Sequence, residues 1–400
     1  MLLPQPSEAA SRQTALGRAL ADAIAVRGPI TFADYMQIAL YEPASGYYTV
    51  PAHDATRQGW AGDYITSTDL HPLFGAAIGR QISQVWRLLG SPDPFVVLED
   101  GAGRGHLARD IHAWAHDVAG DAPEGFVAAL RYNLRDVSAA GGQRVWGATD
   151  VGADTPPHVI LSNELIDAFP VHIIERVAAG WAEVYVTASE APPLLAELLG
   201  PLSSPAVTAY LDRYDVRAER FPLGWRCEVN MVAEEWMAAA AQHLAPAGVV
   251  ITIDYGAPAA DLYSTERHKG TLICYRAHTL SDQPLAFTGE QDITAHVNFT
   301  ALNAVGTAYG LATIGFTNQR DFLTRLGIRT DATALGQRLY PRADTERHTD
   351  AGQSDYLRRS SLQHAVGALL APQGLGGFGV LIQGRGLPDE GATLLGLQSP

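Results

Sequence analysis

Cysteine is scarce in this sequence: only Cys227 and Cys274 occur among its 400 residues, and they lie far apart in the chain. A disulfide framework, or a zinc site built on cysteine pairs, needs more thiols at closer spacing. The scarcity therefore argues against both kinds of site and favours a reducing compartment.

Basic residues are also few, with 28 Lys and Arg against 43 Asp and Glu, which gives a formal net charge of −15. No run of Lys or Arg is long enough to follow a phosphate backbone, so nucleic-acid binding is not expected. An acidic surface could attract a cationic substrate or peptide, although it also serves solubility.

Long apolar runs are missing as well. The stretch around 249–251 falls far short of the ~18 to 20 residues of a membrane span, so none is expected.

The N-terminal residues show no apolar segment of the kind found in secretory signals. Charged side chains are instead scattered at helical spacing among Ala and Leu, namely Glu8, Arg12, Arg18, Asp22 and Arg27. We expect a cytoplasmic protein, with a mitochondrial transit peptide as the alternative.

What the chain does contain is an alternation of short β-rich runs with helical stretches. Strands are expected over 95–99, 132–137, 159–161, 248–253 and 378–382, and helices over 7–26, 31–41, 71–89 and 105–117. Such alternation is typical of an α/β protein with a parallel sheet and helices on both faces. Residues 1–92 are expected to form N-terminal helices and a pocket loop. Residues 93–400 are expected to form the core, interrupted by a cap insertion at about 171–230 and a long loop at about 257–298.

The strongest local motif is the run from Val97 to Gly105, in which an apolar strand enters a glycine-rich turn that opens a helix. Glycines there let the backbone approach a ligand closely and present N–H groups from the start of a helix. A dinucleotide fingerprint would place the third glycine three residues after the second, with an acid ~20 residues further on. Here Gly105 follows Gly103 by two residues, and the next acid at a strand end is Asp136. A dehydrogenase is therefore disfavoured.

The order of the motifs resembles class I S-adenosylmethionine-dependent methyltransferases, and more specifically the MidA-like family. The resemblance rests on the glycine turn, on Asp136 at the end of 134–138, and on the run 161–172 with the sequence LSNELIDAFPVH. Supporting stretches lie at 28–36, 43–48, 62–67, 253–256, 292–297 and 319–323. The resemblance implies a Rossmann-like class I methyltransferase sheet with a helical N-terminal segment and cap insertions, and S-adenosyl-L-methionine as cofactor. The segment Thr68 to His71 departs from the family pattern, and it could line the donor or substrate pocket.

The resemblance also implies roles for individual residues. Glu99 and the backbone at Gly101, Gly103 and Gly105 would hold the amino-acid end of the donor. Asp136 has the acceptor chemistry for two ribose hydroxyls, and Asn163 would complete the cofactor site. Strands of open α/β sheets bind ligands at their carboxyl ends, which is where Asn163 and Glu164 are expected. Glu164 and Asp167 are the candidate catalytic residues, although Asp167 could instead serve only as a carboxylate at the start of a helix.

The acceptor implied by the family is a protein arginine side chain, which begins fully protonated and needs carboxylates to bind it and take its proton. Two alternatives stay open: a small hydroxylated or amino metabolite as acceptor, and an assembly chaperone that binds the donor without turnover. His172, His296 and Tyr64 are further pocket candidates, each equally open to a purely structural role. His112 and His116 lie four apart on a helix, but the intervening residues lack the Glu of the zinc-protease motif, so no metal is expected.

Overall fold

A computed structural model describes residues 14–49, 65–117, 121–136, 144–146, 155–190, 194–388 and 394–398. Its main sheet has seven strands in the order β16-β17-β10-β5-β2-β3-β4. The four central strands β10, β5, β2 and β3 run parallel, while β17 and β4 are antiparallel to their inner neighbours. The strands span Phe95–Asp100 (β2), Leu130–Arg135 (β3), Arg144–Trp146 (β4), Val159–Asn163 (β5), Gly248–Asp254 (β10), Ala312–Asn318 (β16) and Gly379–Arg385 (β17).

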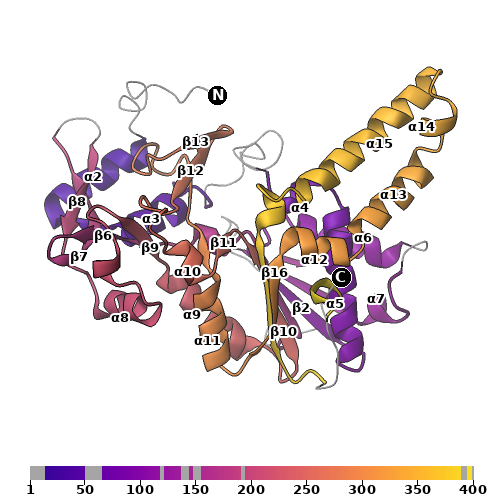
Figure 1. The fold of residues 1–400 in the computed structure, drawn as a ribbon, viewed down its shortest axis with the longest axis horizontal. Coiled ribbons are helices and arrows are strands. Elements are labelled where there is room, and N and C mark those ends of the chain that lie inside the picture. Colours follow the sequence, from indigo (N-terminus) through magenta and orange to yellow (C-terminus); the bar gives the residue numbers. More distant parts are fainter. Residues whose placement is uncertain are drawn as a thin grey trace.

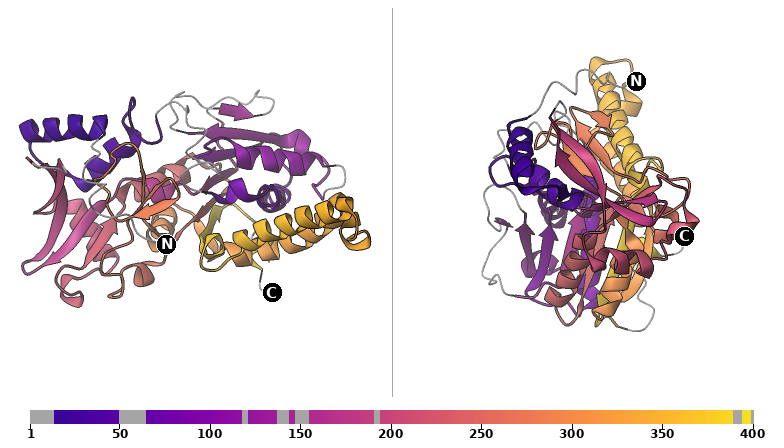
Figure 2. Two further views of the ribbon diagram at one scale, coloured as in Figure 1. Left: turned by 90° about the horizontal axis from the view of Figure 1, so that it is seen from above. Right: turned by 90° about the vertical axis from the view of Figure 1, so that its left-hand side faces the viewer.

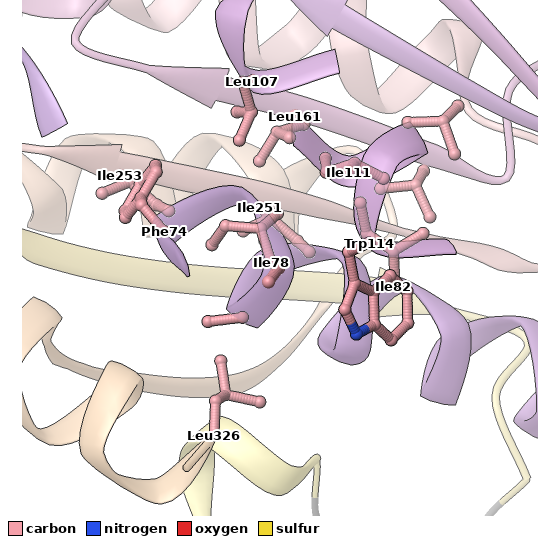
Figure 3. Close-up of a cluster of buried hydrophobic side chains, with 14 of the residues drawn as sticks. Phe74, Ile78, Ile82, Leu107, Ile111, Trp114, Leu161, Ile251, Ile253 and Leu326 are labelled. Atoms are coloured by element: carbon pink, nitrogen blue, oxygen red, sulfur yellow. The ribbon is translucent and has the colours of Figure 1, made fainter. Parts of the chain in front are cut away.

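Continuous apolar runs place β2, β5 and β10 at the centre of this sheet, because a strand covered on both faces has no solvent side to make polar. Every residue of these three strands is buried. Figure 3 shows one side of the resulting core, where Phe74, Ile78 and Ile82 of one helix lie near Leu161 and Ile251 of the sheet. Helices α5 (Leu73–Leu88) and α6 (His106–His116) cover that face, and α9 (Met231–His243) and α11 (Phe299–Ala308) cover the other. The predicted Rossmann-like α/β fold is confirmed.

A second lobe, which we call the insertion lobe, joins residues 14–49, 171–230 and 257–298. Its sheet has the order β1-β7-β6-β9, with β8 paired to β7. Strand β1 (Ile30–Thr31) pairs with β7 (Gly180–Ala188), so the N-terminal helices α2 (Ala15–Arg27) and α3 (Phe32–Tyr41) pack against the insertion. Figures 1 and 2 show these helices beside that sheet, away from the main one. The remaining strands are β6 (His172–Val177), β8 (Leu195–Gly200) and β9 (Arg226–Val229).

The sequence correctly places the start of α3, whereas α2 begins at Ala15 and not at residue 7. Thr31, expected as an N-cap, accepts a hydrogen bond from the Asp34 backbone N–H, and Thr14 caps α2 in the same way. The first seven residues of the helix expected over 7–26 lie outside the described residues. The boundary expected at residue 92 stays a prediction; the packing groups 14–49 with the insertion and α5 with the main sheet.

Residues 257–298, expected to be a long loop, contain two small sheets. Strand β12 (Ile273–Arg276) lies between β13 (Thr279–Ser281) and β14 (Asp292–Thr294), and β11 (Gly256–Ala257) pairs with β15 (Val297–Asn298). Strands of two to four residues show no readable alternation of polar and apolar side chains, which is why the sequence does not reveal them. Short helices α8 (Pro205–Arg213) and α10 (Ala259–Leu262) complete the lobe.

A helical arm projects from the main sheet near the C-terminus (Figure 1). It consists of α13 (Ile328–Leu339), α14 (Arg342–Thr345) and α15 (Asp350–Leu369), and it is reached through α12 (Gln319–Arg325). Ion pairs link α14 to α15, from Arg342 to Asp355 and from Arg359 to Asp344. Two further short helices are α4 (Ser67–Leu70) and α7 (Phe126–Ala129). Within the ranges described, no helix is both long and apolar enough to cross a membrane.

Candidate active site

The glycine-rich turn leaves the carboxyl end of β2 and opens α6, as the sequence predicts. Gly101, Gly103 and Gly105 have φ values of 71°, 52° and 72°, a left-handed conformation that side chains with a Cβ adopt at a cost. A Cβ on Gly101 would also lie 2.7 Å from the Leu165 side chain. The turn therefore needs glycine both for its backbone shape and for its close approach to the neighbouring strand end.

Asp136 reaches this turn from the end of β3. Its Oδ2 accepts a hydrogen bond of 2.6 Å from the Gly103 backbone N–H, although the two residues are 33 positions apart. The backbone carbonyl of Arg135 accepts from the Gly101 N–H in the same region. Turn and carboxylate thus form one polar surface at the carboxyl edge of the sheet.

Glu99 lies beneath the turn as a buried carboxyl on β2. It is 4% exposed, and its Oε2 accepts a hydrogen bond of 2.9 Å from the Tyr132 hydroxyl. Burial raises the pKa of Glu99 to about 8, against the opposing effect of that hydrogen bond. A cation beside Glu99 would lower this pKa again, because it would favour the ionised form.

Glu164 follows Asn163 directly at the end of β5, in a strained backbone conformation with a φ of 53°. Its Oε1 accepts hydrogen bonds from the Ser67 backbone N–H at 2.8 Å and from Asn163 Nδ2 at 3.0 Å. Its Oε2 has no partner among the residues that the structure describes. Burial, together with the neighbouring carboxylates of Asp167 and Asp69, raises the pKa of Glu164 to about 7. Such a pKa suits a group that accepts a proton near neutral pH.

Asp167 lies three residues further on, in a single turn of 3-10 helix over Ile166–Ala168. It is 6% exposed, and burial raises its pKa. Asp254 at the end of β10 supports this turn, because its Oδ2 accepts from the backbone N–H groups of Leu165, Ile166 and Asp167. Burial and the charge of Asp167 raise the pKa of Asp254 strongly. Asp254 therefore provides the carboxylate at the start of this helical turn, a role that the sequence suggested for Asp167. The sequence did not indicate Asp254 as a residue of the site.

Aromatic side chains from the insertion lobe and from the residue after β10 lie around these acids. Tyr255 follows Asp254, and its ring packs edge-on against His296 with 5.4 Å between centroids. The Tyr41 hydroxyl donates to the Ala168 carbonyl at 3.0 Å, and the Tyr48 hydroxyl donates to Asp292 Oδ1 at 2.7 Å. Among these residues only His296 is a candidate from the sequence. Tyr255 could have been added to the candidates from the pairing of β10 with β5, because that pairing brings the residues after both strands to the same edge of the sheet.

Helix α4 and its N-cap, Thr66, connect the two ends of the site. Asp69 accepts from Thr66 through Oδ2, and its Oδ1 lies 3.3 Å from Arg104 Nη2 and 3.2 Å from His106 Nδ1, beside the glycine turn. Ser67 meets Glu164 through its backbone N–H, as described above. The segment Thr68 to His71, whose departure from the family pattern suggested a place near a pocket, therefore borders the site.

The other candidates lie elsewhere. His172 Nδ1 is 2.7 Å from Glu183 Oε1, a fully buried carboxylate, so the structure gives His172 a structural partner. Tyr64 lies outside the described residues. The rings of His112 and His116 lie 6.1 Å apart on α6 in a tilted arrangement, and no group of three His, Cys, Asp or Glu side chains within the described ranges is arranged to hold a metal ion. Cys227 and Cys274 are both buried free thiols.

Comparison with known proteins shows which family has this architecture. A family model described as "Putative S-adenosyl-L-methionine-dependent methyltransferase" matches residues 77–317. Protein arginine methyltransferase NDUFAF7, mitochondrial, of Rattus norvegicus is 29% identical over 81% of this chain and 76% of its own length. The homolog of Drosophila melanogaster is 26% identical over 76% of this chain and 72% of its own length.

A crystal structure of a likely methyl transferase of the COG1565 superfamily from Burkholderia thailandensis, bound to S-adenosyl-homocysteine, is also similar. It has a TM-score of 0.75 and 25% identity, and it covers 99% of this chain and 97% of its own. The names of the curated relatives contradict the expectation of a cytoplasmic protein. These relatives are named as mitochondrial proteins, so that expectation is wrong. Charge spacing at the N-terminus cannot decide between compartments. Since the family model covers more than half of the residues, the chain belongs to the S-adenosyl-L-methionine-dependent methyltransferases of the MidA-like family, and it is an enzyme of that class.

Proposed function

We propose that this enzyme transfers the methyl group of S-adenosyl-L-methionine to a protein arginine side chain, at the carboxyl edge of its main sheet. Three carboxyls with raised pKa values support a cationic acceptor there: Asp167 and Asp254, which are buried, and Glu164, which is half-buried. The names of the curated relatives as protein arginine methyltransferases point to the same acceptor.

The residues beside the glycine turn fit the donor. Gly101, Gly103 and Gly105 would hold its amino-acid end, Asp136 would accept from its ribose hydroxyls, and Glu99 would face its ammonium group. Asn163 would complete the cofactor site at the end of β5. When bound, the donor supplies a methyl group on a cationic sulfur, which a nucleophile displaces in line.

Glu164 would hold the acceptor and take its proton. An arginine side chain is protonated at any physiological pH and offers N–H donors but no free lone pair. It becomes a nucleophile only as a base removes a proton during methyl transfer. Glu164 has the chemistry of that base, because Oε1 is fixed by Ser67 and Asn163 while Oε2 has no described partner. Asp167 would stabilise the cation before the proton leaves.

The observation that carries this proposal is the position of Glu164 at the end of β5, where Ser67 and Asn163 hold Oε1 beside the Asp167 turn and the pKa of the carboxyl is raised. The test incubates the purified enzyme with cell extract and isotope-labelled donor, and then separates protein from small molecules by size. Label recovered as methylarginine after hydrolysis of the protein fraction supports the proposal. Label only in the low-mass fraction would establish a metabolite acceptor. Donor binding with no transfer would establish the chaperone function, and either of these results overturns the proposal.

A further inference from the structure

Four buried polar atoms at this edge of the sheet form no hydrogen bond with favourable geometry to any described residue. They are Asn163 Oδ1, Asp167 Oδ1, the Tyr255 hydroxyl and His296 Nδ1. Asn163 and Asp167 are 9% and 6% exposed, so bulk water does not compensate these atoms freely. Buried polar groups in folded proteins are nearly always paired, and a cluster of exceptions points to a missing ligand.

Several contacts hold these groups in one neighbourhood. Asn163 is the register partner of Ile253 on β10, two residues before Tyr255. The Ala295 N–H donates to the Asp167 carbonyl at 2.9 Å, which brings the segment carrying His296 onto the turn of Asp167. Tyr255 interacts with the side chains of Asp167 and Thr294, and burial and the charge of Asp167 raise its pKa, so the hydroxyl and the carboxylate lie close together.

The position of His296 is itself fixed from the insertion lobe. Its backbone N–H donates to Thr271 Oγ1 at 3.0 Å, and the Thr271 hydroxyl donates to the buried Glu228 at 2.9 Å. The Val297 N–H donates to the Tyr255 carbonyl at 3.0 Å, so the backbones of the two segments are tied together. Neither side chain therefore depends on its own polar atom for its placement.

We propose that Tyr255 and His296 bind the methyl acceptor and, with Asp167, select a guanidinium over a primary ammonium. This inference rests on the proposed function, because it assigns substrate-binding residues to the same site. A guanidinium presents five N–H donors in a plane, which can reach acceptors on separate elements at once. An ammonium presents three donors from one point and leaves some of these acceptors unpaired.

The protonation state of His296 is consistent with this role. Burial, together with the charge of Arg267, lowers the pKa of His296 to about 4, so the imidazole is neutral at pH 7. A neutral ring with its proton on Nε2 accepts a hydrogen bond at Nδ1, whereas an imidazolium would repel the cation.

The experiment measures binding without turnover. Calorimetry with ethylguanidinium and with n-propylammonium, each in the presence of S-adenosyl-homocysteine, compares the parent with Tyr255→Phe, His296→Leu and His296→Asn. Asparagine places an amide oxygen near the position of Nδ1, so it should keep much of the affinity. Tyr309→Phe and His364→Leu are matched controls on the surface, away from the acids.

We expect the parent to bind ethylguanidinium at least tenfold more tightly than n-propylammonium. Tyr255→Phe and His296→Leu should each reduce this preference at least threefold, with unchanged affinity for S-adenosyl-homocysteine, while His296→Asn and the controls retain it. No preference in the parent, or a preference that survives both variants, overturns the inference. The labelling test of the proposed function is read separately, so arginine methylation with unchanged binding preferences would refute only the present inference.

Discussion

Glu164→Gln is the most informative single change, because it keeps the shape of the side chain and both hydrogen bonds to Oε1 while removing the charge. If Glu164 takes the acceptor proton, the methyl-transfer step should slow by about 10² to 10⁴, the usual range for loss of a general base. Donor affinity should hardly change, since Glu164 faces the acceptor in this account. Glu219→Gln, on the surface of the insertion lobe, is the matched control.

The pH dependence of the same step provides a second measurement. The pKa of Glu164 is raised to about 7 in the free protein, and cationic ligands beside it would lower that value by favouring the carboxylate. Below this pKa the base is protonated, so the single-turnover rate of the parent should rise with pH and level off at or below about pH 7. Glu164→Gln should show no such rise.

The stability of the parent protein should fall as pH rises, whereas its methyl-transfer rate should increase. A carboxyl whose pKa is raised in the folded state stabilises the protein below its unfolded pKa of 4.5, and this contribution is lost as pH rises toward 7. A pKa difference of one unit corresponds to ~1.4 kcal/mol. The rise of the Glu164 pKa from 4.5 to about 7 therefore removes about 2 to 3 kcal/mol of the free energy of unfolding, once the partial exposure of Glu164 is allowed for. Urea unfolding of the donor-free protein at pH 8 should therefore find Glu164→Gln at least as stable as the parent. A variant with full methyl-transfer rate, or one that is active but has lost stability at pH 8, would refute this reasoning.

The remaining predictions concern the donor. Gly103→Val should abolish binding of S-adenosylmethionine in calorimetry, because valine is strained at a φ of 52° and its side chain would occupy donor space; a normally folded variant that binds as the parent does would remove the turn from the cofactor site. Asp136→Ala should weaken the donor by about 1.5 to 3 kcal/mol, roughly 10- to 150-fold, and NAD should bind neither form; tight NAD binding would revive the dehydrogenase interpretation. Donor binding at pH 7 should release protons as the ammonium ionises Glu99, whose pKa is about 8, and calorimetry in buffers of different ionisation enthalpy should find a smaller release in Glu99→Gln.

The sequence predicts the parts of this molecule that depend on local patterns. Apolar runs at 95–99, 159–161 and 248–253 mark the central strands, and Thr31 marks the start of a helix. The glycine turn and the acids after β5 follow from the same logic, because parallel strands bring their carboxyl ends to one edge. The position of Glu164 and Asp167 at this edge is therefore predictable without a structure, while their role in catalysis stays a prediction.

Partners from distant segments are not predictable in this way. Ser67 meets Glu164 across 97 residues, and Asp254 meets the Asp167 turn across nearly as many. Strand β1 has only two residues, so its pairing with β7 leaves no periodic signal. Tyr255 and His296 are separated by 41 positions, and only the pairing of β11 with β15 brings their segments together.

A crystal structure of the enzyme with S-adenosyl-homocysteine would test the central claim most directly, namely that donor and acceptor meet at the carboxyl edge of the main sheet. We expect the amino-acid end of the ligand to lie at the turn Gly101 to Gly105. Its ribose hydroxyls should donate to Asp136, and its sulfur should face Glu164. A ligand whose sulfur points away from Glu164 and Asp167, or which binds outside the glycine turn, would contradict it.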